Sequence, residues 1–67
     1  MSALAEELPR EQERVRRLIG IYRSIGPAGL FAIHLMQTSL KQAEIASANG
    51  DVVAMIRALE DLRGYKE

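Results

Sequence analysis

Cysteine and tryptophan are absent from the 67 residues of this chain, and the aromatic residues are limited to two tyrosines and one phenylalanine. Without cysteine, neither a disulfide nor a thiolate metal site can form. The single histidine cannot make a histidine-based zinc site unless carboxylates or a second chain supply further ligands. The chain thus lacks the usual covalent and metal supports of a small hydrophobic core, and association with another chain is the remaining one.

An excess of charge of one sign is also missing, because nine basic residues balance nine acidic ones. Dedicated nucleic-acid binders rely on a clear positive excess, so the composition argues against that function. The most apolar stretch, residues 25–36, is too short for a membrane span, which needs ~20 residues. The beginning, MSALAEELPREQE, is acidic and has no apolar segment of the kind found in signal peptides. We therefore expect a cytoplasmic protein with no membrane segment.

The alternation of apolar and polar residues that marks a half-buried strand does not occur, whereas helical spacing recurs three times. It predicts helices over residues 9–25, 28–48 and 52–63, each with an apolar stripe toward a shared core. These stripes include Ile25 in the first helix and Val52 and Ile56 in the third. The prediction is one all-α domain over residues 1–67, a three-helix bundle or a helical hairpin plus a third helix. Frayed tails are expected over about 1–8 and 64–67.

Two glycine-containing segments, IGPAGL and ANGD, separate the predicted helices. In the first, Gly26 is placed to end a helix with a positive φ angle, and Pro27 suits the start of the next helix. Gly29 is expected in the first turn of that helix, with no special need for glycine. In the second, Gly50 is expected to end a helix, and Asp51 to cap the following one with its carboxylate.

No group of residues has a spacing typical of catalysis. His34 shares its predicted helix face with Gln37, Thr38 and Lys41, none of which is a carboxylate or an activated nucleophile. The glutamates near the start of the first helix are placed to favour the positive end of its dipole rather than to bind a metal. We therefore predict a non-enzymatic protein with no catalytic residue, no metal and no cofactor.

Arginines form the strongest charge feature, since residues 10–25 hold five arginines against two glutamates, a local charge of +3. They are Arg10, Arg14, Arg16, Arg17 and Arg23. Two interpretations are open: a solvated helix surface, or a patch that binds nucleic acid or an acidic partner. Helical spacing puts Arg16 and Arg23 on one side of the helix and the other three on another, so the charge does not form one stripe.

Several large apolar residues fall outside, or at the margin of, the stripes that a three-helix core would use. They are Ile21, Leu30, Phe31, Ile45 and Val53. They indicate either an interface, with a second copy or with another protein, or a wider intramolecular core. Phe31 is the largest of them, and an aromatic anchor commonly dominates an interface, so we expect a homodimer contact there.

The chain beyond residue 13 resembles a group of small helical proteins encoded by phages and prophages, through the shared motifs IGPAG and GDVVAM. The resemblance implies a phage or prophage setting in bacteria, and it brings no assigned activity and no functional residue. The sequence as a whole predicts a small helical adaptor or regulator that binds protein and associates with itself. The alternative is a small nucleic-acid-binding regulator that uses the arginine-rich first helix.

Overall fold

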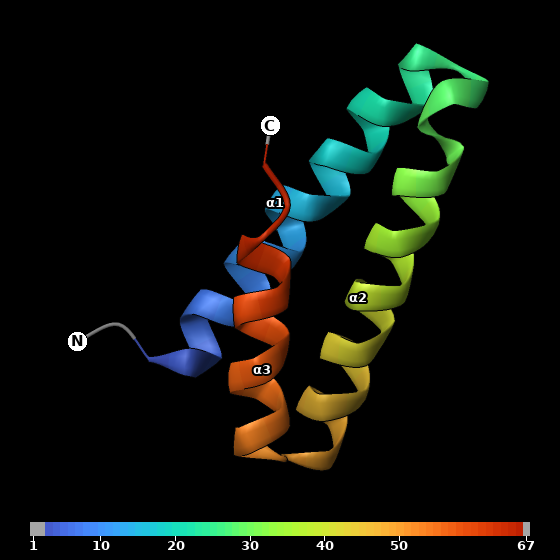
Figure 1. Cartoon of the computed structure of the whole chain (residues 1–67). Helices are drawn as coiled ribbons and strands as arrows, with labels where there is room; N and C mark the ends of the chain where they lie inside the picture. The colour runs from blue at the N-terminus through green and yellow to red at the C-terminus, as the bar shows by residue number, and fades with distance from the viewer. Residues whose placement is uncertain (1–2, 67) are drawn as a thin grey trace.

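The computed structural model describes residues 3–66, and this part of the chain folds into three α-helices without a strand (Figure 1). Helix α1 spans Leu4–Ile25, the short 3₁₀ turn η1 spans Pro27–Gly29, α2 spans Leu30–Asn49 and α3 spans Val52–Arg63. The helices pack against one another, so the predicted all-α three-helix architecture is confirmed. The predicted bounds of the third helix are also those observed.

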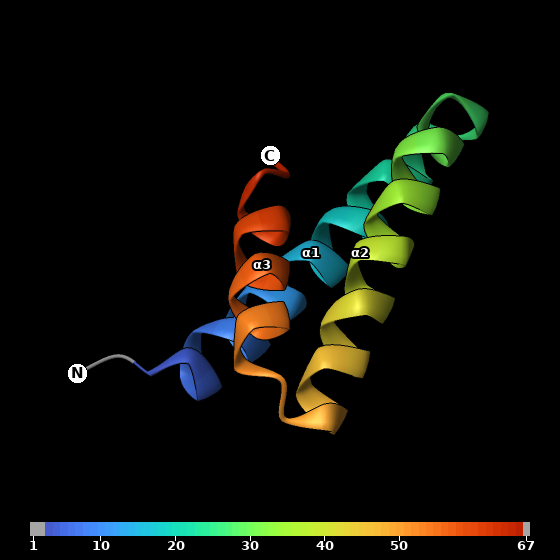
Figure 2. The ribbon, with the colours of Figure 1, turned by 60° about the horizontal axis from the view of Figure 1, so that its bottom comes forward.

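Helices α1 and α2 form a long hairpin, and α3 lies against the half of it that is far from the α1–α2 corner (Figures 1 and 2). The three helices differ in length, with 22 residues in α1, 20 in α2 and 12 in α3. At ~1.5 Å per residue, α2 is about 30 Å long and α3 about 18 Å. The hairpin therefore extends past the end of α3 by roughly two helical turns.

The buried core lies where all three helices meet. Its largest fully buried side chains are Leu8, Val15, Met36 and Leu62. Three residues that spacing assigned to the core stripes, Ile25, Val52 and Ile56, are instead exposed. On α3 the buried residues are Ala58, Leu59 and Leu62. The side of α3 that faces the core is therefore centred nearer to Ala58 than predicted, and Val52 and Ile56 lie toward the solvent. The small Ala43 and Ala58 side chains allow α2 and α3 to approach closely.

Helix α1 begins at Leu4, five residues before its predicted start. Pro9 therefore lies inside the helix and not in its first turn. At this interior position the missing N–H of proline removes one backbone hydrogen bond of the helix. Leu8, expected in a frayed tail, is fully buried, and Glu7 forms an ion pair with Arg63 at the end of α3. These contacts with a distant part of the chain explain why the helix extends past the proline. Residues 1 and 2 of the predicted tail lie outside the described residues.

The predicted positive φ angles are confirmed at both helix ends, with +92° at Gly26 and +64° at Gly50. The predicted cap of α3 is also present, because the Ala54 N–H donates to Asp51 Oδ1 at 3.1 Å. The ends of α1 and α2 and the start of α3 are thus set by residues next to them in the sequence, which is why local patterns were sufficient to find them.

Gly29 does not behave as predicted, because it is buried in η1 rather than placed in the first turn of α2. A Cβ atom at this position would collide with the backbone carbonyl oxygen of Tyr22 on α1. Glycine is therefore required at residue 29 by the close approach of the turn to α1. Helix α2 starts only at Leu30, after this turn.

Tyr65 belongs to the fold rather than to a frayed tail. Its side chain is half-buried against the core, and its hydroxyl lies 2.8 Å from Ser39 Oγ on α2. Its backbone N–H donates to the carbonyl of Leu62 at 3.2 Å. The end of α3 is thereby attached to the middle of α2, while residue 67 of the predicted tail lies outside the described residues.

Candidate interaction surface

Two polar contacts show which side of each hairpin helix faces α3. On α1, Arg14 Nη2 donates to the carbonyl oxygen of Leu62 at 2.9 Å. On α2, Ser39 Oγ is the partner of the Tyr65 hydroxyl. In an α-helix, residues four, seven or eleven positions apart lie within about 40° of each other around the axis, and residues eight apart within about 80°, so all of them fall on one broad side. The α3-facing side of the hairpin can therefore be followed past the point where α3 ends.

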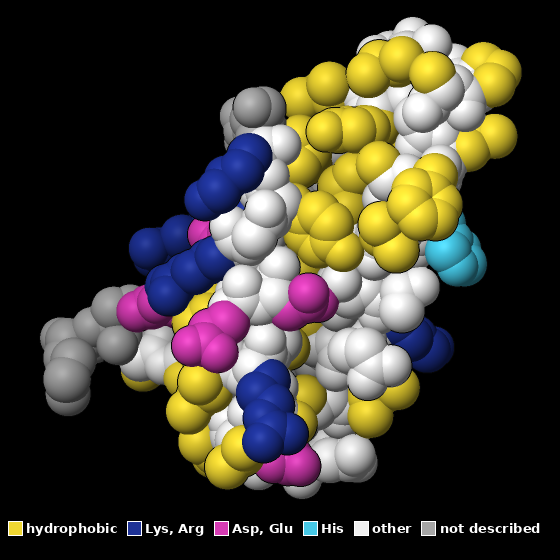
Figure 3. Space-filling view, viewed as in Figure 1, with side chains coloured by type: hydrophobic (Ala, Val, Ile, Leu, Met, Phe, Trp, Pro, Cys, Tyr) yellow, Lys and Arg dark blue, Asp and Glu magenta, His cyan; other side chains and the backbone are white. Residues whose placement is uncertain are grey.

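Beyond α3 the exposed residues at these positions are all apolar. On α1 this side of the hairpin carries Ile21 and Ile25, which follow Arg14 by seven and eleven residues. On α2 it carries residues four, seven and eight positions before Ser39, which are Leu35, Ala32 and Phe31, and the exposed Ala28 of the turn η1 lies just before them. We call these six residues the tip face. Figure 3 shows hydrophobic side chains gathered over this part of the hairpin, whereas charged side chains lie mostly over α3 and the start of α1.

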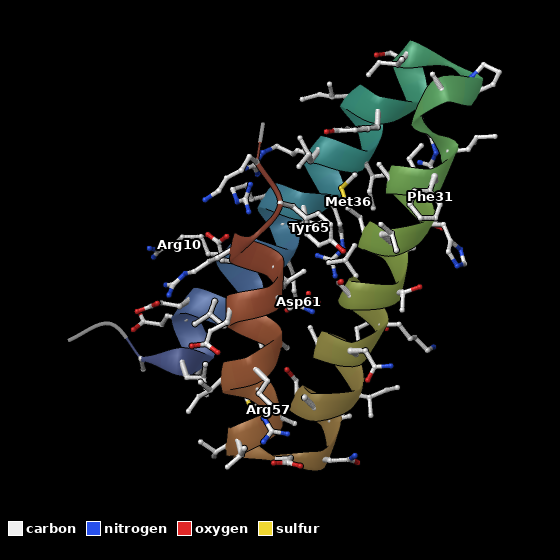
Figure 4. All side chains as sticks on the ribbon, in the orientation of Figure 1. Arg10, Phe31, Met36, Arg57, Asp61 and Tyr65 are labelled. Atoms are coloured by element: carbon white, nitrogen blue, oxygen red, sulfur yellow. The ribbon has the colours of Figure 1, made fainter. Side chains whose placement is uncertain are left out.

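The large side chains of the tip face are open to solvent. Their exposed fractions are 74% for Phe31, 57% for Ile25, 54% for Ile21 and 42% for Leu35. Figure 4 places Phe31 on the outside of α2, whereas Met36 points into the space between α1 and α2. The half-buried Ala32 packs against the core, so the tip face is continuous with the core. A contiguous apolar patch of this kind commonly marks a binding site on a soluble protein.

The five residues predicted as an interface are all exposed, but the structure does not bring them together. Ile21 and Phe31 belong to the tip face. Leu30 is the first residue of α2 and so lies at the tip. It points about a third of a turn around the helix axis from the side that carries Phe31 and Leu35. Ile45 lies on the side of α2 opposite the core, and Val53 lies in the first turn of α3, at the other end of the molecule.

Sequence analysis predicted only two of the six tip-face residues, Ile21 and Phe31, and among the large side chains of this face it missed Ile25 and Leu35. Ile25 was assigned to the core stripe of the first helix and Leu35 to the margin of the packing face of the second, because the spacing of apolar residues does not show how far a neighbouring helix extends. The useful signal was the difference in predicted helix length, since a third helix of 12 residues cannot cover the full length of a second helix of about 20 residues.

The predicted basic patch is likewise not one surface. Arg14 is half-buried, and besides its bond to α3 its Nε pairs with Glu11 Oε1 at 2.9 Å, so its role is to stabilise the bundle. The other four, Arg10, Arg16, Arg17 and Arg23, are exposed on different sides of α1, and Figure 4 shows Arg10 pointing away from the bundle. The alternative of nucleic-acid binding thus gains no support from the arrangement of the arginines.

Two shallow grooves lie away from the tip face. One, of about 440 Å³, runs along α3 and is lined by residues that include Gln42, Asp51, Arg57 and Asp61. The other, of about 420 Å³, is lined by Glu11, Arg14, Arg63, Tyr65 and Lys66. Neither contains a nucleophile beside a base, and the described residues include no group of three or more His, Asp or Glu side chains suited to a metal ion. His34 is exposed and lies outside both grooves.

None of the helices that the structure describes has the length and apolar character needed to cross a membrane. No protein-family model, curated protein or solved structure matches this chain. The resemblance to phage-encoded helical proteins therefore stays a prediction, and the function has to be argued from the surface itself.

Proposed function

We propose that this protein is a non-enzymatic interaction module that binds protein through its tip face. The observation that carries the proposal is the exposure of four large apolar side chains on one side of a folded hairpin, over the length that α3 leaves uncovered. Burying such a face against a partner removes apolar surface from water, which is the main driving force of protein association.

The chemistry of the tip face favours protein over the other classes of partner. It contains no charged residue, so it offers nothing to the phosphates that dominate nucleic-acid affinity. None of its residues lines either groove, whereas small-molecule sites are concave and enclose most of the ligand. An apolar surface on paired helices is a common docking site for further helices, and Phe31 supplies an aromatic anchor. We also propose that the protein acts in the bacterial cytoplasm and comes from a phage or prophage. These two parts of the proposal rest on the sequence alone.

The proposal is tested with a matched pair of charged substitutions on α2. Phe31→Glu places a charge in the tip face, and Ile45→Glu places one at another exposed apolar position about 21 Å further along the same helix, outside the tip face. Tagged wild type and both variants are used to recover proteins from a bacterial extract that also contains the untagged chain. We expect wild type and Ile45→Glu to retain the same proteins, identified by mass spectrometry, and Phe31→Glu to lose them.

Circular dichroism of all three proteins serves as the control, because an exposed position should accept glutamate without loss of helix. Recovery of the same proteins by wild type and by a folded Phe31→Glu variant would contradict binding through the tip face.

A further inference from the structure

We infer that the tip face is covered by the tip face of a second copy of this chain, related to the first by a twofold axis. This inference rests on the proposed function and names its partner. Three properties of the described residues support it: the charge of the face, the space that α3 leaves free, and the area available for contact.

The charge of the tip face suits contact with itself. In a twofold interface each patch meets an identical patch, so any charge of one sign would face its own like. All six residues of the tip face are uncharged and apolar, so two copies meet without repulsion and without a buried unpaired charge. The face is also continuous with the core through Ala32. An apolar interface that continues a core is the kind found in homodimers.

The short α3 decides how two copies fit together. If the two hairpins lay parallel, the second hairpin would occupy the space already filled by α3 (Figure 2). If they lie antiparallel, tip against tip, each hairpin takes the free space beyond the α3 of the other. The two tips then overlap over about 12 Å, the two turns by which the hairpin outruns α3. This arrangement places α2 opposite the partner's α2 and makes a short four-helix bundle at the centre of the dimer.

The side chains of the face fit such a contact. The small Ala28 of η1 and Ala32 of α2 allow the helices to approach closely, and the neighbouring Phe31 is exposed on α2. Four large side chains with exposed fractions from 42% to 74% offer on the order of 500 Å² of apolar surface per copy. The total of about 1,000 Å² for two copies is near the lower limit for a specific interface, so we expect a dissociation constant in the micromolar range.

Sedimentation equilibrium of the full chain, from about 5 to about 500 μM, tests the inference. We expect wild type to change from monomer to dimer within this range, and Ile45→Glu to behave in the same way. Phe31→Glu should remain monomeric throughout, which corresponds to at least about 100-fold weaker association, because the dimer would bury two unpaired carboxylates side by side. Circular dichroism should show equal helix content in all three.

Either of two results would overturn the inference. A wild type that is monomeric at the highest concentration excludes the second copy as the partner. A dimer that survives Phe31→Glu unchanged uses another surface. The extract experiment distinguishes failure of the dimer inference from failure of the proposed function. Suppose that wild type is monomeric but still recovers another protein, and that Phe31→Glu does not recover it. The tip face then binds protein, but its partner is not a second copy.

Discussion

The half of the molecule where three helices meet and the hairpin tip where only two meet bury similar residues to very different extents. Leu8 and Leu62 in the three-helix half are fully buried, whereas Leu35 and Phe31 at the tip are exposed. Two packed helices shield only the sides that face each other, and a third element is needed to cover the side next to them. The difference therefore comes from where α3 ends and not from the composition of the two halves.

The two halves are also held together by different contacts. In the three-helix half, polar contacts link residues far apart in the sequence: Arg63 with Glu7, Arg14 with the Leu62 carbonyl, and Ser39 with Tyr65. At the tip the structure depends on the turn between α1 and α2, where Gly29 lies directly against the backbone of Tyr22. Long-range contacts thus define the bundle, and one close backbone approach defines the tip.

The largest contrast is expected between two leucine truncations. Leu62→Ala removes a fully buried side chain and leaves a cavity among three helices, so it should lower the free energy of unfolding by about 2–5 kcal/mol. Leu35→Ala removes a side chain that is already 42% exposed in the monomer, and its effect should stay below about 1 kcal/mol. Urea titrations followed by circular dichroism, at protein concentrations where the chain is monomeric, measure both. Equal losses would show that the tip is as well packed as the rest.

The turn at the tip is tested by one substitution at two glycines. Gly29→Ala should lower the free energy of unfolding by about 1–3 kcal/mol, because the added methyl group meets a backbone carbonyl that cannot rotate away. Gly20→Ala is the control, since no atom lies near the added methyl group and the position is exposed in α1. It should raise the free energy of unfolding by up to ~1 kcal/mol through better helix propensity. A gain in stability from both substitutions would disprove the close packing of the turn.

The structural features that sequence patterns predicted correctly depend on local contacts, and those that they missed depend on contacts between helices. The bounds of α3 were predicted as observed because Gly50 and Asp51 act on residues next to them. The start of α1 was missed because its contacts are with distant residues, as in the ion pair of Glu7 with Arg63, 56 residues away. Gly29 was missed for a related reason, because its need for glycine comes from the backbone of Tyr22 on α1, which the chain brings back against the turn.

The candidate surface was found in part for a similar reason. Phe31 and Ile21 were recognised because they lie outside any regular apolar stripe. Ile25 continues the stripe of α1 without a break, so nothing local distinguishes it from a core residue. Only the position of the end of α3 shows that this part of the stripe is uncovered.

The smallest effects are expected where the three-helix half gives way to the tip, at the contact between Ser39 and Tyr65. Ser39→Ala and Tyr65→Phe each remove one side of a single partly buried hydrogen bond, so each should lower the free energy of unfolding by about 0.5–1.5 kcal/mol. The double variant should lose little more than either single variant, because the bond is lost only once. Urea titrations of the four proteins measure this coupling, and losses that simply add would mean that the hydroxyl groups do not interact. Dimerisation should be unchanged in Tyr65→Phe, since the bond attaches α3 to α2 below the tip face and does not belong to it.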